Sequence, residues 1–249
     1  MTEYSEIEML FDTMKSFLRK FRLKKFAPAG SFAKIYPSCK DFTMTSVERM
    51  KALHKATVYI SEYHVPGDLV ECGVWKGGSA MMMATTLVAH RDISRNIFLY
   101  DTYAGMTKPE AKDREISTGK LAMEKWKRNE RGEYNNWCYA ALKMVKLNMN
   151  KTKYPPERIR FVKGGVESTI PKISPEKISL LRLDTDWFAS TYHELRYLYP
   201  LLVSGGILIV DDYGHWTGAK KAVDKYFREQ KLPFDFEKID YSGLIGVKK

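Results

Sequence analysis

The stretch D-L-V-E-C-G-V-W-K-G-G-S, residues 68–79, decides the fold of this chain. Its first half is a short apolar run, which is typical of a buried strand. The glycines that follow let the backbone bend sharply and approach a ligand, and a helix that begins at the Gly77–Gly78 pair offers free N–H groups. The spacing is not that of the G-x-G-x-x-G dinucleotide fingerprint. The segment therefore predicts a strand–turn–helix unit that holds a small ligand.

Short apolar runs and helical patterns alternate through the rest of the chain. After the strand at 68–74, the pattern predicts strands at 96–102, 159–164, 178–186 and 206–212, and helices at about 78–90, 188–199 and 217–230. Such alternation predicts a Rossmann-like α/β fold with a doubly wound, mostly parallel sheet. Residues 234–240 and 243–249 are predicted to form a closing hairpin with a two-residue turn, which brings the sheet to seven strands.

The first 64 residues have helical patterns and predict an N-terminal helical cap on the domain formed by residues 65–249. Apolar residues recur at helical spacing in I-E-M-L-F-D-T-M-K-S-F-L-R-K-F, residues 7–21. A second helical pattern covers residues 46–63, after a loop that contains Pro37. We therefore expect a helical extension in front of the first strand.

The segment from Thr102 to about Pro156 is far longer than a connection between two strands requires. It is polar and basic, with helical patterns at 116–129 and 133–149. An insertion after the second strand would lie over the carboxyl edge of the sheet, where ligands bind in folds of this type. We expect residues of about 103–156 to form a mobile lid, and an inert surface insertion is the alternative.

Composition indicates an ordinary globular protein of 249 residues, 44% of them hydrophobic. The three cysteines have no paired spacing, so neither a disulfide framework nor a zinc site is expected. The N-terminus carries acidic residues where a signal peptide would be basic, and no apolar stretch reaches about 18 residues. These features predict a cytoplasmic protein without a membrane span.

The net charge of +11 raises the question of a nucleic-acid partner. Residues 106–153 carry 12 Lys and Arg against 6 Asp and Glu, and the first 55 residues carry 11 against 6. Because the excess is spread over the chain rather than gathered in one stripe, a solvated basic surface is the favoured interpretation. A polyanion-binding face, or a surface that attracts an anionic substrate, stays open.

Four aspartates follow two of the predicted strands, in L-D-T-D (Asp184 and Asp186) and V-D-D-Y (Asp211 and Asp212). Neighbouring parallel strands would bring their carboxylates together at one edge of the sheet. Like charges this close repel unless something positive lies between them. A divalent cation meets that need, and oxygen ligands point to magnesium. Four turn-capping aspartates are the structural alternative.

The same strand ends also indicate which reaction the site could carry out and which ligand it could bind. A hydroxyl held at a cation loses its proton more readily, and a carboxylate outside the metal shell could accept that proton. Asp186 lies two residues beyond Asp184 and is the candidate base. Glu71, before the first glycine, suits a ligand with an amino group, and Asp101 at the end of the second strand is placed to bind ribose hydroxyls.

Together these motifs resemble the macrocin O-methyltransferase family. The resemblance spans about residues 43–230 and rests on V-E-C-G-V-W-K-G-G-S, D-T-Y-A-G-M, F-V-K-G-G, L-D-T-D-W-x-x-S-T and D-D-Y-G-H-W-x-G-A-x-x-A-V-D, in that order. It implies the class I methyltransferase fold with a helical extension and a lid, S-adenosylmethionine as methyl donor and a dependence on Mg²⁺. Best-known members methylate sugar hydroxyls on antibiotics.

The resemblance also implies roles for individual residues. It places the metal on Asp184, Asp211 and Asp212, and makes Asp184 and Asp186 the catalytic residues, with Asp186 as the base. The residues that it places around S-adenosylmethionine are Glu71, Gly73, Val74, Gly77 and Ser79, then Asp101 and Thr102 at the ribose, Gly165 and Val166 near the adenine, and Asp184. Two departures stand out: the lid has no histidine, and Val166 stands where an aromatic residue is expected.

We therefore expect a magnesium-dependent O-methyltransferase whose acceptor is a small molecule with a hydroxyl, such as a sugar or a glycosylated natural product. A catechol-like phenol is an alternative acceptor, which a flat aromatic slot would favour over an open polar cleft. A basic nucleic-acid-binding protein on a methyltransferase scaffold is an alternative of another class, and the intact Glu71, Asp101 and aspartate pairs argue against it. The sequence is compatible with a homo-oligomer.

Overall fold

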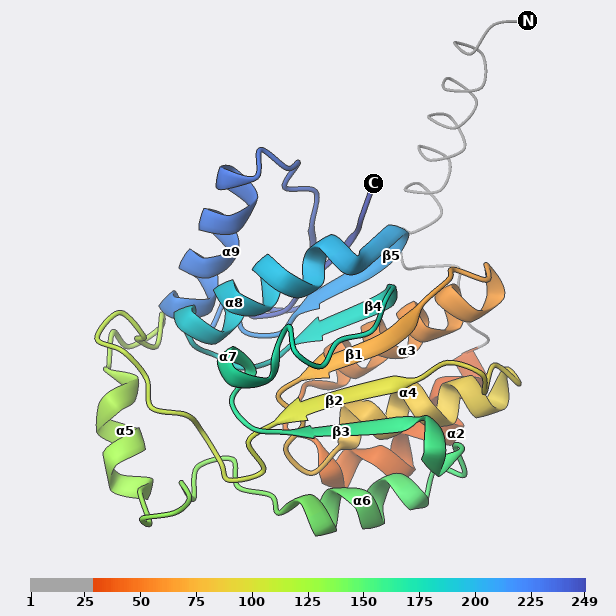
Figure 1. The fold of residues 1–249 in the computed structure, drawn as a ribbon, viewed down its shortest axis with the longest axis horizontal. Coiled ribbons are helices and arrows are strands. Elements are labelled where there is room, and N and C mark those ends of the chain that lie inside the picture. Colours follow the sequence, from red (N-terminus) through yellow and green to blue (C-terminus); the bar gives the residue numbers. More distant parts are fainter. Residues whose placement is uncertain (1–28) are drawn as a thin grey trace, which may run out of the picture.

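The computed structural model describes residues 29–249, so the helix predicted at 7–21 lies outside the described residues. A seven-stranded sheet in the order β3-β2-β1-β4-β5-β7-β6 runs through the molecule (Figure 1). Its strands are β1 (Asp68–Cys72), β2 (Ile97–Asp101), β3 (Ile159–Lys163), β4 (Ile178–Leu183), β5 (Leu202–Val210), β6 (Glu237–Lys238) and β7 (Leu244–Val247). The five strands β1 to β5 pair in parallel, and β7 pairs antiparallel with β5 and with β6. The predicted fold class is confirmed.

The strand ends differ from the prediction for a physical reason. β1 and β4 stop at Cys72 and Leu183, before the glycine and aspartates that were included in the predicted strands. Those residues leave the sheet and line a cavity. The two-residue hairpin turn is wrong: β6 and β7 are joined by residues 239–243, because Asp240 accepts hydrogen bonds from the N–H groups of Ser242 and Gly243 and so shapes a longer loop.

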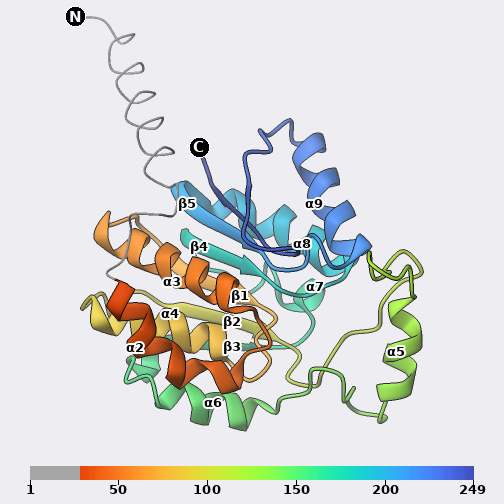
Figure 2. The same cartoon turned by 180° about the vertical axis from the view of Figure 1, so that it is seen from behind.

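Helices cover both faces of the sheet (Figures 1 and 2). One face carries α2 (Ala29–Cys39), α3 (Val47–Glu62) and α4 (Gly78–Ala89), and the other carries α7 (Val166–Thr169), α8 (Phe188–Leu198) and α9 (Thr217–Glu229). A hydrophobic core lies on each face of the sheet, and neighbouring residues of a strand point into opposite cores. Leu69 of β1 packs on the α2–α4 side and Val70 on the α7–α9 side. Three short 3₁₀ turns complete the connections, η1 (Lys40–Phe42), η2 (Pro156–Arg158) and η3 (Tyr199–Leu201).

The helical extension before β1 is confirmed within the described residues, with one correction. Pro37 lies inside α2 and not in a loop. Proline cannot donate the hydrogen bond to the carbonyl four residues earlier, and only two residues of the helix follow it before the helix ends. The loop lies at residues 43–46, and Ser46 caps α3 by accepting a hydrogen bond from the Arg49 N–H.

The segment predicted as a lid contains two helices shorter than the patterns suggested, α5 (Ala122–Asn129) and α6 (Leu142–Asn150). α6 packs beside α4, and α5 stands apart from the sheet (Figure 1). No helix within residues 29–249 is long and apolar enough to cross a membrane.

Candidate active site

A cavity of about 260 Å³ opens at the carboxyl end of the parallel strands. The predicted residues that line it are Gly73, Val74, Ser79, Asp101, Asp184, Asp186, Asp211 and Asp212. A smaller hollow shares part of this wall and is lined by the predicted residues Thr102, Gly165 and Val166. The strand register explains the convergence, because the Asp184 N–H donates to Cys72 O and the Asp211 N–H donates to Leu183 O. Neither Glu71 nor Gly77 lines either hollow.

Gly73 is the residue at which the first strand meets the aspartate loop. Its φ is +84°, and a Cβ on this residue would lie 2.0 Å from the backbone oxygen of Asp184. Only glycine allows so close an approach of two backbones. Gly73 therefore allows the end of β1 and the aspartate loop to meet in the wall of the cavity.

Asp101 ties two loops of the cavity together. Its Oδ2 accepts hydrogen bonds from the N–H groups of Val74 (2.7 Å) and Trp75 (3.1 Å), and its Oδ1 accepts from the Tyr103 N–H (2.7 Å). Burial raises the pKa of Asp101, and these backbone hydrogen bonds oppose that rise. The carboxylate therefore has a structural role in holding these loops together. Its contact with a ribose stays a prediction.

Glu71 lies beneath the cavity floor. Its side chain is fully buried, with Oε1 2.5 Å from Nη1 of Arg182, and Oε2 has no hydrogen-bond partner among the described residues. Burial raises the pKa of Glu71 to about 7, although the Arg182 charge lowers it. A direct contact with an amino group of the ligand stays a prediction.

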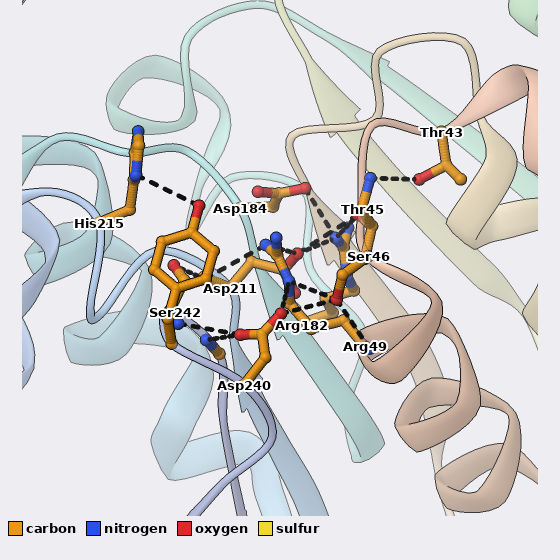
Figure 3. Close-up of polar contacts among 12 residues, drawn as sticks. Thr43, Thr45, Ser46, Arg49, Arg182, Asp184, Asp211, His215, Asp240 and Ser242 are labelled. Carbon is orange, nitrogen blue, oxygen red and sulfur yellow. Dashed lines mark hydrogen bonds and ion pairs between the residues drawn. The ribbon is translucent and has the colours of Figure 1, made fainter.

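Arg182 lies among the carboxylates, and its importance was missed in the sequence (Figure 3). It is 1% exposed, and its Nη2 lies 2.7 Å from Asp184 Oδ2 and 2.6 Å from Asp211 Oδ2. Arg49 of α3 adds a second guanidinium, with Nη1 3.0 Å from Asp211 Oδ2 and Nε 2.9 Å from Asp240. The positive charge that the clustered aspartates require is therefore supplied in part by two arginines.

Two buried carboxylate oxygens of the site stay without a partner. Asp211 Oδ1 and Asp212 Oδ2 are buried without hydrogen-bond partners among the described residues. Burial, and then the charges of Asp186 and Asp184, raise the pKa of Asp212 well above its ordinary value. Across residues 29–249, no group of three His, Cys, Asp or Glu side chains is arranged so that it could hold a metal. The donor chemistry fits a hard cation, whereas a closed metal site is not formed.

Asp186 occupies a strained turn at the cavity wall. Its φ is +67°, and the Trp187 N–H donates to Thr185 O at 2.7 Å, which closes a γ-turn with Asp186 at its apex. Burial raises the pKa of Asp186 to about 7, and the charge of Asp184 adds to the rise. A carboxylate with this pKa has the basicity that general-base catalysis near neutral pH requires.

The segment predicted as a lid is anchored to this wall. The Trp187 indole donates to Thr107 O at 2.9 Å, the Phe188 N–H donates to Asp113 Oδ1 at 3.0 Å, and the Ile116 N–H donates to His215 O at 2.8 Å. Trp137 from the same segment packs against Trp216, with 5.8 Å between the ring centroids. The insertion is therefore part of the cavity, and its mobility stays a prediction.

Glu194 is a buried acid near the site that the sequence motifs did not indicate. It lies on α8 with 0% of its surface exposed, and its Oε1 accepts a hydrogen bond from Thr185 Oγ1 at 2.9 Å. Burial raises the pKa of Glu194 to about 8, against a small lowering by the Thr185 bond. This acid therefore keeps its proton at neutral pH.

We expect Glu194→Gln to stabilise the protein at high pH and not at low pH. The folded-state pKa lies above the unfolded one, so the native state binds the extra proton, and its stability falls as pH rises from about 4.5 to about 8. Glutamine cannot ionise, so its advantage should approach the order of 2–4 kcal/mol at pH 9 and vanish near pH 5. Urea denaturation of both proteins at the two pH values measures this; a difference independent of pH would contradict it.

Comparisons with known proteins agree with this geometry. The family described as Macrocin-O-methyltransferase (TylF) matches residues 10–246. An 8-demethyl-8-(2,3-dimethoxy-alpha-L-rhamnosyl)-tetracenomycin-C 4'-O-methyltransferase of Streptomyces olivaceus is 30% identical over 82% of this chain and 74% of its own. The mycinamicin III 3''-O-methyltransferase of Micromonospora griseorubida is 27% identical over 84% and 79%. The solved structure of the O-methyltransferase NovP is 28% identical, with a TM-score of 0.72 over 83% of this chain and 82% of that one.

Proposed function

Because this chain belongs to the macrocin O-methyltransferase family and is an S-adenosylmethionine-dependent O-methyltransferase, we propose that it methylates a hydroxyl of a sugar carried by a small molecule. The observation that carries the proposal is the convergence of Asp184, Asp186, Asp211 and Asp212 on one cavity beside the glycine turn. Carboxylates at this place can orient and deprotonate a hydroxyl. Relatives named for rhamnosyl tetracenomycin and mycinamicin support a glycosylated acceptor.

The donor is proposed to lie across both hollows. Gly73, Val74 and Ser79 line the larger hollow and suit the methionine part of S-adenosylmethionine, while Gly77 and Glu71 line neither hollow. Asp101 lines both hollows and Thr102 lines the smaller one beside it, which suits the ribose. Gly165 and Val166 line the smaller hollow and suit the adenine. Val166 cannot stack on the adenine ring as an aromatic side chain at this position would.

Asp186 is proposed as the base that takes the proton of the acceptor hydroxyl. Its carboxylate borders the cavity, its pKa lies near 7, and it makes no ion pair with either arginine. Magnesium is proposed to bind Asp184, Asp211 and Asp212, since Asp211 Oδ1 and Asp212 Oδ2 have unused lone pairs. When bound, it would supply Lewis-acid polarisation of the hydroxyl.

The acceptor is proposed to enter between the lid and the loop before α3. Trp137 and Trp216 offer aromatic faces on which a sugar ring or a phenol can lie. His215 and Tyr241 border the same opening, with 3.4 Å between Tyr241 Oη and His215 Nδ1. Polar groups and four carboxylates beside the tryptophans favour a sugar, and the aromatic wall keeps a catechol as the second candidate.

The test is methyl transfer from S-adenosylmethionine to a panel of acceptors, followed by mass spectrometry. The panel contains rhamnosides, other glycosylated natural products, their aglycones and catechol. Methylation of the glycosides and not of the aglycones is the expected result. Methylation of catechol alone would replace the sugar proposal with the phenol.

Chelation tests the metal separately. EDTA is expected to lower the rate of methyl transfer by about 100-fold or more, because metal polarisation is worth several kcal/mol. Added Mg²⁺ should restore the rate, and S-adenosylhomocysteine binding, measured by calorimetry, should persist in EDTA. Full activity in EDTA would show that Arg182 and Arg49 supply all the positive charge that this site uses.

A further inference from the structure

The turn that holds Asp186 has a conformation that its own residues do not favour. Of the four aspartates at the strand ends, only Asp186 has a positive φ, and it is the apex of the γ-turn from Thr185 to Trp187. A γ-turn with positive φ is strained, at a cost of about 1–3 kcal/mol, and persists only where the surroundings fix it. The groups that fix it therefore decide where the Asp186 carboxylate lies.

One set of contacts comes from α8, on the core side. Thr185 Oγ1 donates to the fully buried Glu194 at 2.9 Å. Ser190 Oγ lies 3.3 Å from Thr185 O and 3.2 Å from Trp187 O, so its single hydroxyl hydrogen can be shared between the carbonyls at the two ends of the turn. A protonated Glu194 places no charge in the core, and its carbonyl oxygen still accepts the hydrogen bond from Thr185 Oγ1.

The other set comes from the lid segment. Asp113 is fully buried, and its Oδ1 accepts the hydrogen bond of the Phe188 N–H, directly after the turn. The Trp187 indole donates to Thr107 O. Asp113 lies against the start of α9 as well, since a Cβ on Gly218 would be 1.9 Å from its Oδ1. The turn is thus held between a helix of the core and the segment that covers the cavity.

We propose that Glu194, acting through Thr185, and Asp113, acting through the Phe188 N–H, are positioning residues that hold Asp186 in its productive geometry. This inference rests on the proposed role of Asp186 as the base. Neither residue touches the cavity, so each acts on the rate through the turn. A displacement of a reacting group by about 1 Å can lower the rate about 100-fold.

The experiment compares matched pairs of variants at neutral pH. Thr185→Val and Glu194→Met remove the hydrogen bond, whereas Thr185→Ser and Glu194→Gln keep it. We expect each of the first pair to lower kcat by about 10- to 100-fold. In Glu194→Met, KM for the acceptor and the Kd of S-adenosylhomocysteine should change less than about threefold, because Glu194 lines neither hollow, whereas Thr185 lines the smaller one. The second pair should keep kcat. The double variant Thr185→Val/Glu194→Met should lose no more than the worse single variant, because both remove one bond.

Asp113→Ala, with Asp113→Asn as its conservative partner, tests the lid side by the same measurements. Normal kcat in Thr185→Val and Glu194→Met would overturn the proposal. So would parallel losses in kcat, Kd and Tm, which would indicate a purely structural role. Asp186→Asn separates this outcome from a failure of the proposed base. If that variant turns over normally, Asp186 is not the base. If it is inactive while Thr185→Val and Glu194→Met are fully active, Asp186 can still be the base and only the positioning role is wrong.

Discussion

Replacing Arg182 with methionine is expected to lower the free energy of unfolding by about 3–5 kcal/mol, the usual effect of removing one partner from a buried ion pair. The guanidinium contacts Glu71, Asp184 and Asp211, and two of these three side chains are as buried as the arginine itself. Methionine fills much of the volume but leaves their charges uncompensated. Urea denaturation at pH 7 gives the change directly.

Two controls identify the cause of that loss. The double variant Glu71→Gln/Arg182→Met removes one charge of each sign and should recover part of the stability. Lower pH should also reduce the deficit, since protonation of Glu71, whose pKa is raised to about 7 by burial, removes a charge that lacks a partner. A stability loss that is the same at pH 5 and pH 8, and unaffected by the second substitution, would point to packing rather than charge.

Much of the fold could be predicted because the signal is local. Strand and helix periods lie within each segment, and alternation of the two fixes a doubly wound sheet whose carboxyl edge carries the motifs. The order of β1, β2, β4 and β5 then brings Gly73, Asp101 and the aspartate pairs together without any knowledge of side-chain contacts. The convergence of the site was therefore foreseeable from the sequence.

The electrostatics of the site were less foreseeable, although one signal was present. Arg182 stands inside I-S-L-L-R-L, a strand buried along its whole length. A charged residue in such a run must have a partner, and the nearest acids in the predicted sheet were Glu71 and the aspartates. A metal cation was predicted from the clustered aspartates alone, although Arg182 already supplies part of the positive charge that they require. Arg49 gave no such signal, because its contact with Asp211 joins residues 162 positions apart.

The anchoring of the segment predicted as a lid could not be foreseen for a similar reason. Asp113 lies in a polar, basic stretch in which one more acid is unremarkable by composition. Its partner, the Phe188 N–H, is 75 positions away. Periodicity and local motifs carry no information about such a pair, which exists only after the sheet has brought the two segments together.

Asp186→Asn is expected to lower methyl transfer by about 10²- to 10⁴-fold, the usual contribution of a general base. Asparagine keeps the size of the side chain and tolerates a positive φ, so the γ-turn should survive the change. Asp184 and Asp211 keep their contacts with Arg182, so S-adenosylhomocysteine affinity and Tm should stay close to those of the wild type.

The comparison with Asp184→Asn separates a base from a ligand of the cation. Asp184 bonds Arg182 and is proposed to bind magnesium, so its replacement should weaken Mg²⁺ binding, measured by calorimetry, as well as turnover. Asp186→Asn should lose turnover while Mg²⁺ binding persists. Equal loss of Mg²⁺ binding in both variants would make Asp186 a ligand of the cation. Normal turnover in Asp186→Asn would instead leave proton removal to another group of the cavity wall, and Asp212, whose pKa is raised well above its ordinary value and whose Oδ2 is unpartnered, is the next candidate.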